Sequence, residues 1–267
     1  MCCLFLAASS TVAIAQTNVV DLVNPIIGTN GMGHTFPGAC VPFGLVQLSP
    51  DTDTIPHNVD GQYQPRSYEY CAGYQHKDSS IVGFSHTHFS GTGHSDLGDI
   101  LIMPTTGTLK LNPGTATNPD GGYRSRFSHD TEISRPGYYE VMLADYGVKA
   151  QLTTTQRAGI HKYTYPTNSE NQRIILDMIH GIYNYDGKVL WTNIRVENDT
   201  LVTGYRITNG WARTNYTYFA MSFSKPITHY GCEEKAKVDY RGGYAKFNMK
   251  ENFPDIGGRK IVAYFDF

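Results

Sequence analysis

Short runs of alternating apolar and polar residues recur along the chain and predict β-strands separated by turns. Clusters of glycine, proline, asparagine and aspartate divide these runs at roughly ten-residue spacing, which is typical of β-sandwiches. No stretch has the periodicity of a long helix. We therefore predict an all-β protein of two packed antiparallel sheets, a β-sandwich that forms one domain over residues 17–267. The predicted strands lie at residues 44–48, 100–103, 138–143, 148–155, 161–165, 173–177, 201–207, 216–223 and 261–267.

The segment of residues 81–104 concentrates histidine, aspartate and glycine between two apolar runs. Alternate side chains of an extended strand share a face, so the pattern predicts that His86 and His88 point the same way. The loop after them is rich in residues that form tight turns and let a ligand approach the main chain. We therefore predict a polar site in this loop. Its further candidate residues are Gly93, His94 and Asp96.

Three interpretations of this loop follow from the chemistry of its side chains. His86 and His88 could bind a metal ion, with His94 and the aspartates after it as further ligands. Metal-dependent hydrolases of the H-x-H-x-D-H type, however, need a carboxylate where this chain has Ser90. Neutral histidine, aspartate and threonine side chains could instead bind the hydroxyl groups of a sugar. In the third interpretation the histidines are structural and form hydrogen bonds within the core of the loop.

The amino-acid composition limits which classes of molecule the protein is expected to bind. Charged residues make up 17% of the chain and the formal net charge is -2, so no basic surface favours nucleic acid. The 19 tyrosines and 12 phenylalanines favour strands, and aromatic rings also suit contacts with sugars. No G-x-S-x-G motif, Walker loop or dinucleotide fingerprint is present in the sequence, which disfavours serine hydrolysis and nucleotide chemistry.

Residues 1–15 are similar to an export signal. Cys2–Ala7 is apolar and small residues precede Gln16, although no lysine or arginine comes before the apolar run. No later stretch is apolar enough to span a bilayer, so we expect no membrane span. We therefore predict an exported protein, in the periplasm or outside the cell.

Three cysteines remain after removal of such a leader. Their spacing is not that of a zinc-thiolate site, and two of them could form one disulfide. They are Cys40, Cys71 and Cys232.

Five separated motifs follow one another along the chain. They are NPIIGT (24–29), FPGACVPFG (36–44), CAGYQHKDSSIVGFSHTHFSGTGHSDLGDILIMPT (71–105), QLTTTQRAGIHKYTYP (151–166) and NGWARTNYTYFAMSFSKP (209–226). Together they resemble the amino-terminal domain of glycoside hydrolase family 92, and GFSHTHFSGTG is the most specific of them. Members of that family are exported, calcium-dependent, inverting exo-α-mannosidases, found especially in Bacteroidetes that degrade mannan and N-glycans. The resemblance therefore implies α-mannoside glycans as partners.

The resemblance also implies an architecture. Family members pair an amino-terminal β-sandwich, similar to mutarotase-like carbohydrate-binding sandwiches, with an (α/α)6 barrel. The barrel carries the catalytic acid, the catalytic base and most calcium ligands. Inverting hydrolysis needs two carboxyl groups about 6.5 to 9.5 Å apart. We therefore expect that this chain is a fragment without catalytic residues, binds no calcium or other metal itself, and is inactive until a barrel domain joins it.

Site residues carried over from the family are expected to bind substrate or to contact the barrel. We associate the position of His94 with the choice of leaving sugar. Relatives specific for α-1,2 linkages have tryptophan where this chain has Tyr70, so the linkage stays open. A free-standing secreted carbohydrate-binding or structural β-sandwich is the alternative, and a small metalloenzyme built on the two histidines would carry stoichiometric zinc. The expected site residues are Tyr70, His86, His88, Gly93, His94 and Asp96.

Overall fold

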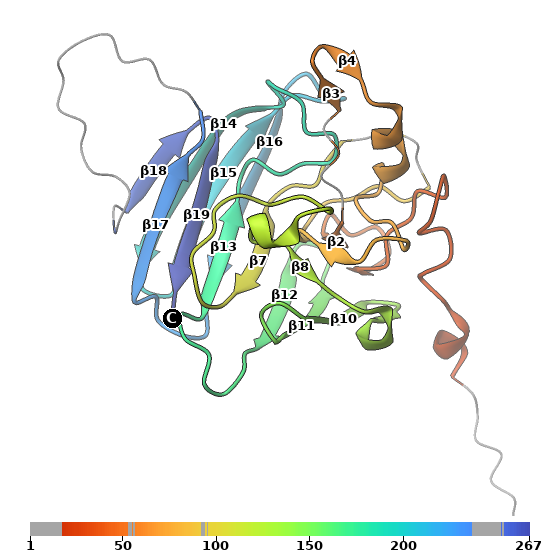
Figure 1. The fold of residues 1–267 in the computed structure, drawn as a ribbon, viewed down its shortest axis with the longest axis horizontal. Helices are drawn as coiled ribbons and strands as arrows, with labels where there is room; N and C mark the ends of the chain where they lie inside the picture. Colours follow the sequence, from red (N-terminus) through yellow and green to blue (C-terminus); the bar gives the residue numbers. More distant parts are fainter. Residues whose placement is uncertain are drawn as a thin grey trace, which may run out of the picture.

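A seven-stranded antiparallel sheet forms the centre of the molecule (Figure 1). The structure is a computed structural model that describes residues 18–52, 55, 57–91, 94, 96–236, 252 and 254–267. The expected leader, residues 1–15, lies outside the described residues. In spatial order the central strands are β1 (Ala39–Cys40), β2 (Gln47–Asp51), β6 (Gly83–Ser85), β7 (Leu101–Thr105), β13 (Arg173–Asp177), β19 (Ile261–Asp266) and β17 (His229–Glu234).

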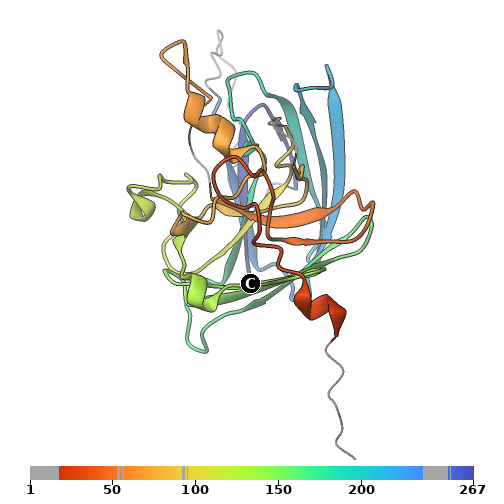
Figure 2. The same ribbon diagram turned by 90° about the vertical axis from the view of Figure 1, so that its right-hand side faces the viewer.

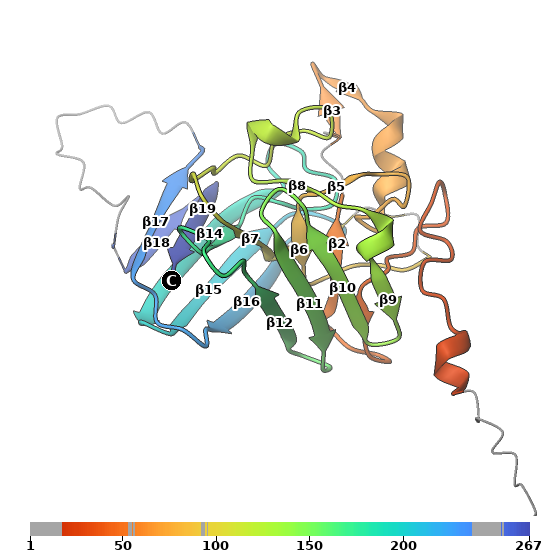
Figure 3. The ribbon, with the colours of Figure 1, turned by 60° about the horizontal axis from the view of Figure 1, so that its bottom comes forward.

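Two four-stranded antiparallel sheets accompany the central sheet. In Figure 3 the first of them lies in front of β2, β6 and β7. Its strands, in spatial order, are β12 (Gly159–Thr164), β11 (Val148–Thr154), β10 (Tyr138–Leu143) and β9 (Ile133–Arg135). The strands of the second are β16 (Asn215–Ser222), β15 (Leu201–Thr208), β14 (Val189–Asn198) and β18 (Asp255–Gly258).

The remaining elements are short. The β3–β4 hairpin and the helix η2 project from the body of the sandwich (Figure 2). The small strands are β3 (Asn58–Val59), β4 (Gln62–Tyr63), β5 (Ser80–Ile81) and β8 (Ser125–Arg126), and the 3-10 helices are η1 (Val19–Leu22), η2 (Pro65–Tyr70), η3 (Pro119–Gly121) and η4 (His129–Thr131). No helix among the described residues is long and apolar enough to cross a membrane.

The central strands are apolar on both faces because each face packs against one of the smaller sheets. On β7, Leu101 and Met103 belong to the core with β10 and β11, whereas Ile102 belongs to the core with β14 and β15. On β13, Ile175 and Leu176 divide between the same two cores. Strands buried on both faces lose the apolar and polar alternation of a half-exposed strand. The predicted antiparallel β-sandwich is confirmed, with its central sheet covered on both sides.

No disulfide joins the cysteines of the described region to one another. Cys40 is exposed, and Cys71 and Cys232 are buried without forming a disulfide. Burial raises the pKa of each of these thiols, and that of Cys232 reaches about 11. The folded core therefore holds together through packing and hydrogen bonds rather than through a disulfide among these three residues.

Candidate functional site

Loops from distant parts of the sequence meet beside the central sheet. We call Asp51 and the described residues of 70–75, 86–100, 178–188 and 209–211 the loop cluster. Gly98 donates to the Thr87 carbonyl at 2.9 Å within the 86–100 segment, and Ile182 donates to the Leu97 carbonyl at 3.1 Å and so joins the 178–188 segment to it. Asn209 donates to the Lys188 carbonyl at 2.7 Å. Main-chain hydrogen bonds therefore connect three of the four segments.

Asp51, the last residue of β2, is the buried centre of the loop cluster. One carboxylate oxygen accepts from His88 Nε2 and the other from His180 Nε2, each at 2.8 Å. Burial alone would raise the pKa of Asp51, but the charges and hydrogen bonds of the two histidines outweigh it and hold the pKa well below its usual range. Asp51 therefore stays ionised and links two loops that are distant in sequence.

His88 is fully buried, and each of its ring nitrogens faces an acceptor. Nδ1 lies 2.7 Å from the Gln47 carbonyl, while Nε2 lies 2.8 Å from Asp51. The two contacts fix the orientation of the ring through both of its nitrogens. His88 thus links Gln47 and Asp51 in the interior and has no exposed surface to offer a ligand.

His86 contacts other residues than His88 does. The strand β6 ends at Ser85, and His86 Nδ1 then donates to the Ile100 carbonyl at 2.6 Å. Its Nε2 lies 3.0 Å from Nε2 of His161, whose Nδ1 accepts from the Tyr163 hydroxyl at 2.7 Å. Burial lowers the pKa of His86 to about 4 and, together with His86, holds that of His161 well below its ordinary value. The two rings form a neutral pair.

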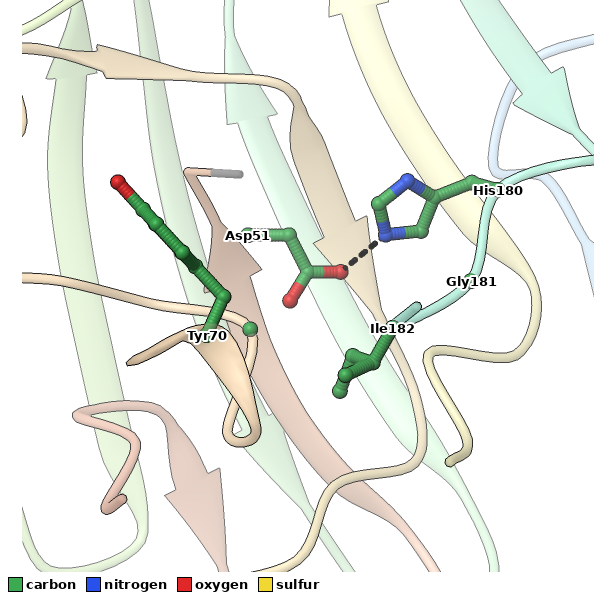
Figure 4. A pocket seen from close by; sticks show the side chains of 6 residues that line it. Asp51, Tyr70, His180, Gly181 and Ile182 are labelled. Atoms are coloured by element: carbon green, nitrogen blue, oxygen red, sulfur yellow. Dashed lines mark hydrogen bonds and ion pairs between the residues drawn. The ribbon is translucent and has the colours of Figure 1, made fainter. Parts of the chain in front are cut away.

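A small cavity lies beside Asp51 (Figure 4). Its volume is about 10 Å³, close to the space that one water molecule needs. Tyr70 lines it, as do His180 and Ile182. The Tyr70 hydroxyl points away from Asp51 (Figure 4) and donates to the Asp78 carboxylate at 2.9 Å. The cavity is too small for a sugar ring.

A buried ion pair between Arg206 and Asp99 connects β15 with the loop cluster. Arg206 on β15 and Asp99 lie 2.9 Å apart, and both side chains are almost completely buried. Asp99 also accepts from the Thr87 hydroxyl at 2.8 Å. Arg206 donates to the carbonyls of Met178 and His180. This single side chain therefore ties the loop after β6 to the loop after β13.

Lys188 is a further buried cation in this region. Its ammonium group donates to the Ile182 carbonyl and lies 3.7 Å from Asp96. Burial lowers the pKa of Lys188 to about 8. Lys188 therefore helps to hold the 178–188 loop against the 86–100 loop.

His94 and Asp96 lie near an exposed tryptophan. The His94 ring meets Trp211 edge to face with centroids 4.2 Å apart, and Asp96 accepts from the Trp211 main-chain N–H at 2.9 Å. The Trp211 side chain is 68% exposed. Its indole ring therefore presents a solvent-exposed aromatic surface beside the predicted loop. Gly93 lies outside the described residues.

Several backbone conformations in the loop cluster are strained. Leu97, Ile100 and Tyr183 have positive φ angles of 75°, 56° and 53°. Such angles cost about 1 to 3 kcal/mol each in residues other than glycine, and they concentrate at functional sites. Gly73 has a φ of 80°, and a Cβ there would lie 2.1 Å from an Asp51 carboxylate oxygen, so only glycine fits against the buried carboxylate.

Sequence reasoning located the loop but missed its main partners. His180 lies three residues beyond the end of the predicted strand at 173–177, and Asp51 ends β2 just beyond the predicted run at 44–48. A polar residue at or shortly after the end of a buried strand was the available signal. Among the described residues, His86 and His88 belong to no group of three metal-ligating side chains. The group that the structure does contain is His76, His129 and Glu132.

Comparison with known proteins identifies the family and supports the fold. The model of the glycosyl hydrolase family 92 N-terminal domain matches residues 22–267. A family 92 α-mannosidase of Bacteroides thetaiotaomicron, solved in complex with mannoimidazole, is 41% identical with a TM-score of 0.80; the match covers 93% of this chain and 30% of that one. A family 92 inverting mannosidase of Bacteroides thetaiotaomicron VPI-5482 is 25% identical with a TM-score of 0.68, over 97% of this chain and 30% of its own.

A curated relative is also described as a glycosidase. An uncharacterized secreted glycosidase of Arthroderma benhamiae is 29% identical over 170 residues, which are 60% of this chain and 19% of that protein. This chain spans less than a third of the length of each of these relatives. With its sandwich fold and its ordered motifs, the chain belongs to glycosyl hydrolase family 92, as the N-terminal domain of that family.

Proposed function

We propose that this domain forms part of the substrate pocket of a secreted exo-α-mannosidase and that a second, catalytic domain completes the pocket. The observation that carries the proposal is the 41% identity, over 93% of the chain, to an α-mannosidase in complex with mannoimidazole. The substrate class would be α-mannosides such as mannan or N-glycans. The loop cluster, with Trp211 and His94 at its surface, would face the sugar or the second domain.

The dimensions of the site support a pocket shared with another domain. Pockets that bind small molecules usually measure about 300 to 1,000 Å³. The cavity at Asp51 measures about 10 Å³, and an open depression lined by Tyr185, Asp186 and Lys260 measures about 230 Å³. Neither would enclose an oligosaccharide. A wall supplied by a second domain over the loop cluster would do so.

The acidic groups of the loop cluster also support a separate catalytic domain. An inverting glycosidase needs a carboxylic acid of raised pKa that can donate a proton to the leaving oxygen. Asp51 is instead held ionised by two histidines, and Asp99 is paired with Arg206. Asp96 accepts two main-chain N–H groups, those of Leu97 and Trp211. These carboxylates hold the loops in place through ion pairs and hydrogen bonds. The catalytic acid and the catalytic base would therefore come from the second domain.

Calcium would also be bound by the second domain, because the carboxylates of the loop cluster already have partners. Ca²⁺ takes six to eight oxygen ligands, largely from carboxylates and carbonyls. The carboxylates of Asp51, Asp96 and Asp99 are already engaged by cationic side chains or main-chain N–H groups, so they do not fit a calcium site. In our proposal this domain positions sugar and loops, and the calcium-dependent step takes place across the interface.

Apolar residues beside the loop cluster would contribute to that interface. Gly31 and Gln75 exchange hydrogen bonds of 2.8 and 2.9 Å, which place the segment after η1 against the loop cluster. Ile27 and Met32 in this segment are largely exposed. Exposed apolar groups that gather beside a polar site are typical of interaction surfaces. The chain would be exported, as the secreted relative from Arthroderma benhamiae suggests.

The chain's two tryptophans give a matched test in the complete enzyme. Replacing Trp211 with alanine is expected to lower kcat/KM on α-linked mannobiose by at least about tenfold, which corresponds to about 1.4 kcal/mol of transition-state stabilisation. The physical reason is loss of the exposed ring beside His94. Trp191→Ala is the control, because this ring is partly exposed on β14, outside the loop cluster. Its kcat/KM is expected to stay within about twofold.

Steady-state kinetics of both variants, with circular dichroism to check folding, measure this difference. Equal losses in the two variants would contradict a substrate-facing role for the loop cluster. A fall in kcat/KM without a change in mannobiose binding would assign Trp211 to domain contact instead.

A further inference from the structure

A group of three metal-ligating side chains lies outside the loop cluster, at η4. One ring nitrogen each of His76 and His129 and a carboxylate oxygen of Glu132 all lie within 4.8 Å of one another. The helix η4 precedes β9, at the edge of the sheet that faces the viewer in Figure 3. Two segments about fifty residues apart in sequence thus bring three side chains together that can serve as zinc ligands.

The carboxylate of this group is held in place by buried tyrosines. Glu132 Oε1 accepts from the hydroxyls of Tyr74 and Tyr139 at 2.9 and 2.7 Å. Both tyrosines are buried in the core between β10 and the central sheet. Metal-binding carboxylates are typically oriented by outer hydrogen bonds of this kind. The Tyr74 hydroxyl also lies 3.0 Å from the other oxygen, Oε2, which in addition accepts from His129 Nδ1 at 2.6 Å.

The histidines are arranged for a shared ligand. The rings of His76 and His129 lie with centroids 4.0 Å apart at 33°, so two positive imidazolium ions there would repel each other. Nδ1 of His76 is buried and has no hydrogen-bond partner among the described residues. A buried polar atom without a partner is costly. The His76 ring thus has a hydrogen-bonding capacity that the described part of the chain leaves unused.

From these contacts we infer that His76, His129 and Glu132 form a zinc-binding site on this domain. Two imidazoles and one carboxylate are a ligand set of three-ligand zinc sites, in which water occupies the fourth position. The His129 side chain is 38% exposed, so water reaches the site. Zinc would displace the proton that His129 Nδ1 donates to Glu132, and that proton would pass to solvent.

The ligand chemistry distinguishes this site from a calcium site. Ca²⁺ prefers oxygen ligands, whereas imidazole favours zinc and neighbouring transition metals. Bound zinc would join the segment at His76 to the segment at η4. Because the metal would bind the folded chain in preference to the unfolded one, it would stabilise the fold.

Metal titration of the purified full chain tests the inference. After removal of metals with a chelator, we expect one tightly bound Zn²⁺ per chain by calorimetry and elemental analysis, unaffected by excess Ca²⁺. At a zinc concentration about one hundred times Kd, the Tm should rise by about 5 to 10 °C and return to its starting value with EDTA. Co²⁺ in place of zinc should give visible absorption bands without a thiolate charge-transfer band.

Three variants locate the metal. His129→Ala should weaken zinc binding by at least about 100-fold, and Tyr74→Phe, which removes only an outer hydrogen bond, by about 10- to 100-fold. His229→Ala is the matched control, because His229 is also 38% exposed and also lies near a carboxylate, that of Asp266. Its zinc affinity should not change.

Several outcomes would overturn the assignment. They are an absence of stoichiometric zinc binding, equal affinities in the His129 and His229 variants, and a cobalt-thiolate band that places the metal on cysteine. If His129→Ala does not fold, the cobalt spectrum of the unmodified chain and the Tyr74→Phe titration still decide the matter.

Discussion

Arg206→Leu is expected to lower the free energy of unfolding by about 3 to 5 kcal/mol, because it leaves the buried Asp99 carboxylate without its cation. The two side chains lie 2.9 Å apart and are almost fully buried. The same substitution removes the donors that hold the Met178 and His180 carbonyls. Urea denaturation followed by tryptophan fluorescence and circular dichroism measures the change.

Two further variants separate the ion pair from general damage to the fold. Arg195→Leu on the neighbouring strand β14 is the control, because its side chain is 59% exposed and pairs with Glu197 at the surface; we expect a change of less than about 1 kcal/mol. Adding Asp99→Asn to Arg206→Leu should cost less than the sum of the two single changes, because the buried charge is gone. A loss of less than about 1 kcal/mol in Arg206→Leu would contradict the assigned role of this pair.

Acidification is expected to destabilise the domain through the neutral pair His86 and His161. Burial lowers the pKa of His86 from 6.5 to about 4 and holds that of His161 well below 6.5. Between pH 6.5 and 4 the unfolded chain binds protons that the folded chain excludes, so stability falls as the pH falls. The His86 contribution is fully present above pH 6.5, and about 3 kcal/mol of it is lost by pH 4.

Chemical denaturation between pH 7.5 and 4 measures this loss. In His161→Gln the loss should be smaller, because one of the two excluded protons no longer has a site. His57→Gln, which removes a histidine outside the pair, should leave the slope close to that of the unmodified chain. A pH dependence that is the same in all three proteins would contradict the assignment to His86 and His161.

The alternation of residues predicted many strands, and its failures have local causes. The predicted runs at 138–143 and 173–177 coincide with β10 and β13. The pattern missed β14, whose pairing with β15 is shifted between Val189 and Trp191 and again between Val196 and Asn198. Such irregularities interrupt the two-residue period on which the prediction rests. It also missed β18, which includes two glycines and is only four residues long.

The candidate site was only partly predictable because its contacts are long-range. The histidine spacing identified the loop, but β6 ends at Ser85 and the rings of His86 and His88 then turn to different partners. His180 lies 129 residues from Asp51 in the sequence, yet it lies 2.8 Å away in the fold. No local pattern encodes such a contact. The family resemblance, by contrast, rested on ordered motifs and is confirmed.

Mannose release from α-linked mannobiose in the presence of Ca²⁺ tests the central claim most directly. The purified chain would be assayed alone and fused to the helical barrel domain of a family 92 mannosidase. Our account predicts no release above background by the chain alone and calcium-dependent release by the fusion. Turnover by the chain alone would show that this domain supplies its own catalytic carboxyl groups, and it would contradict the account.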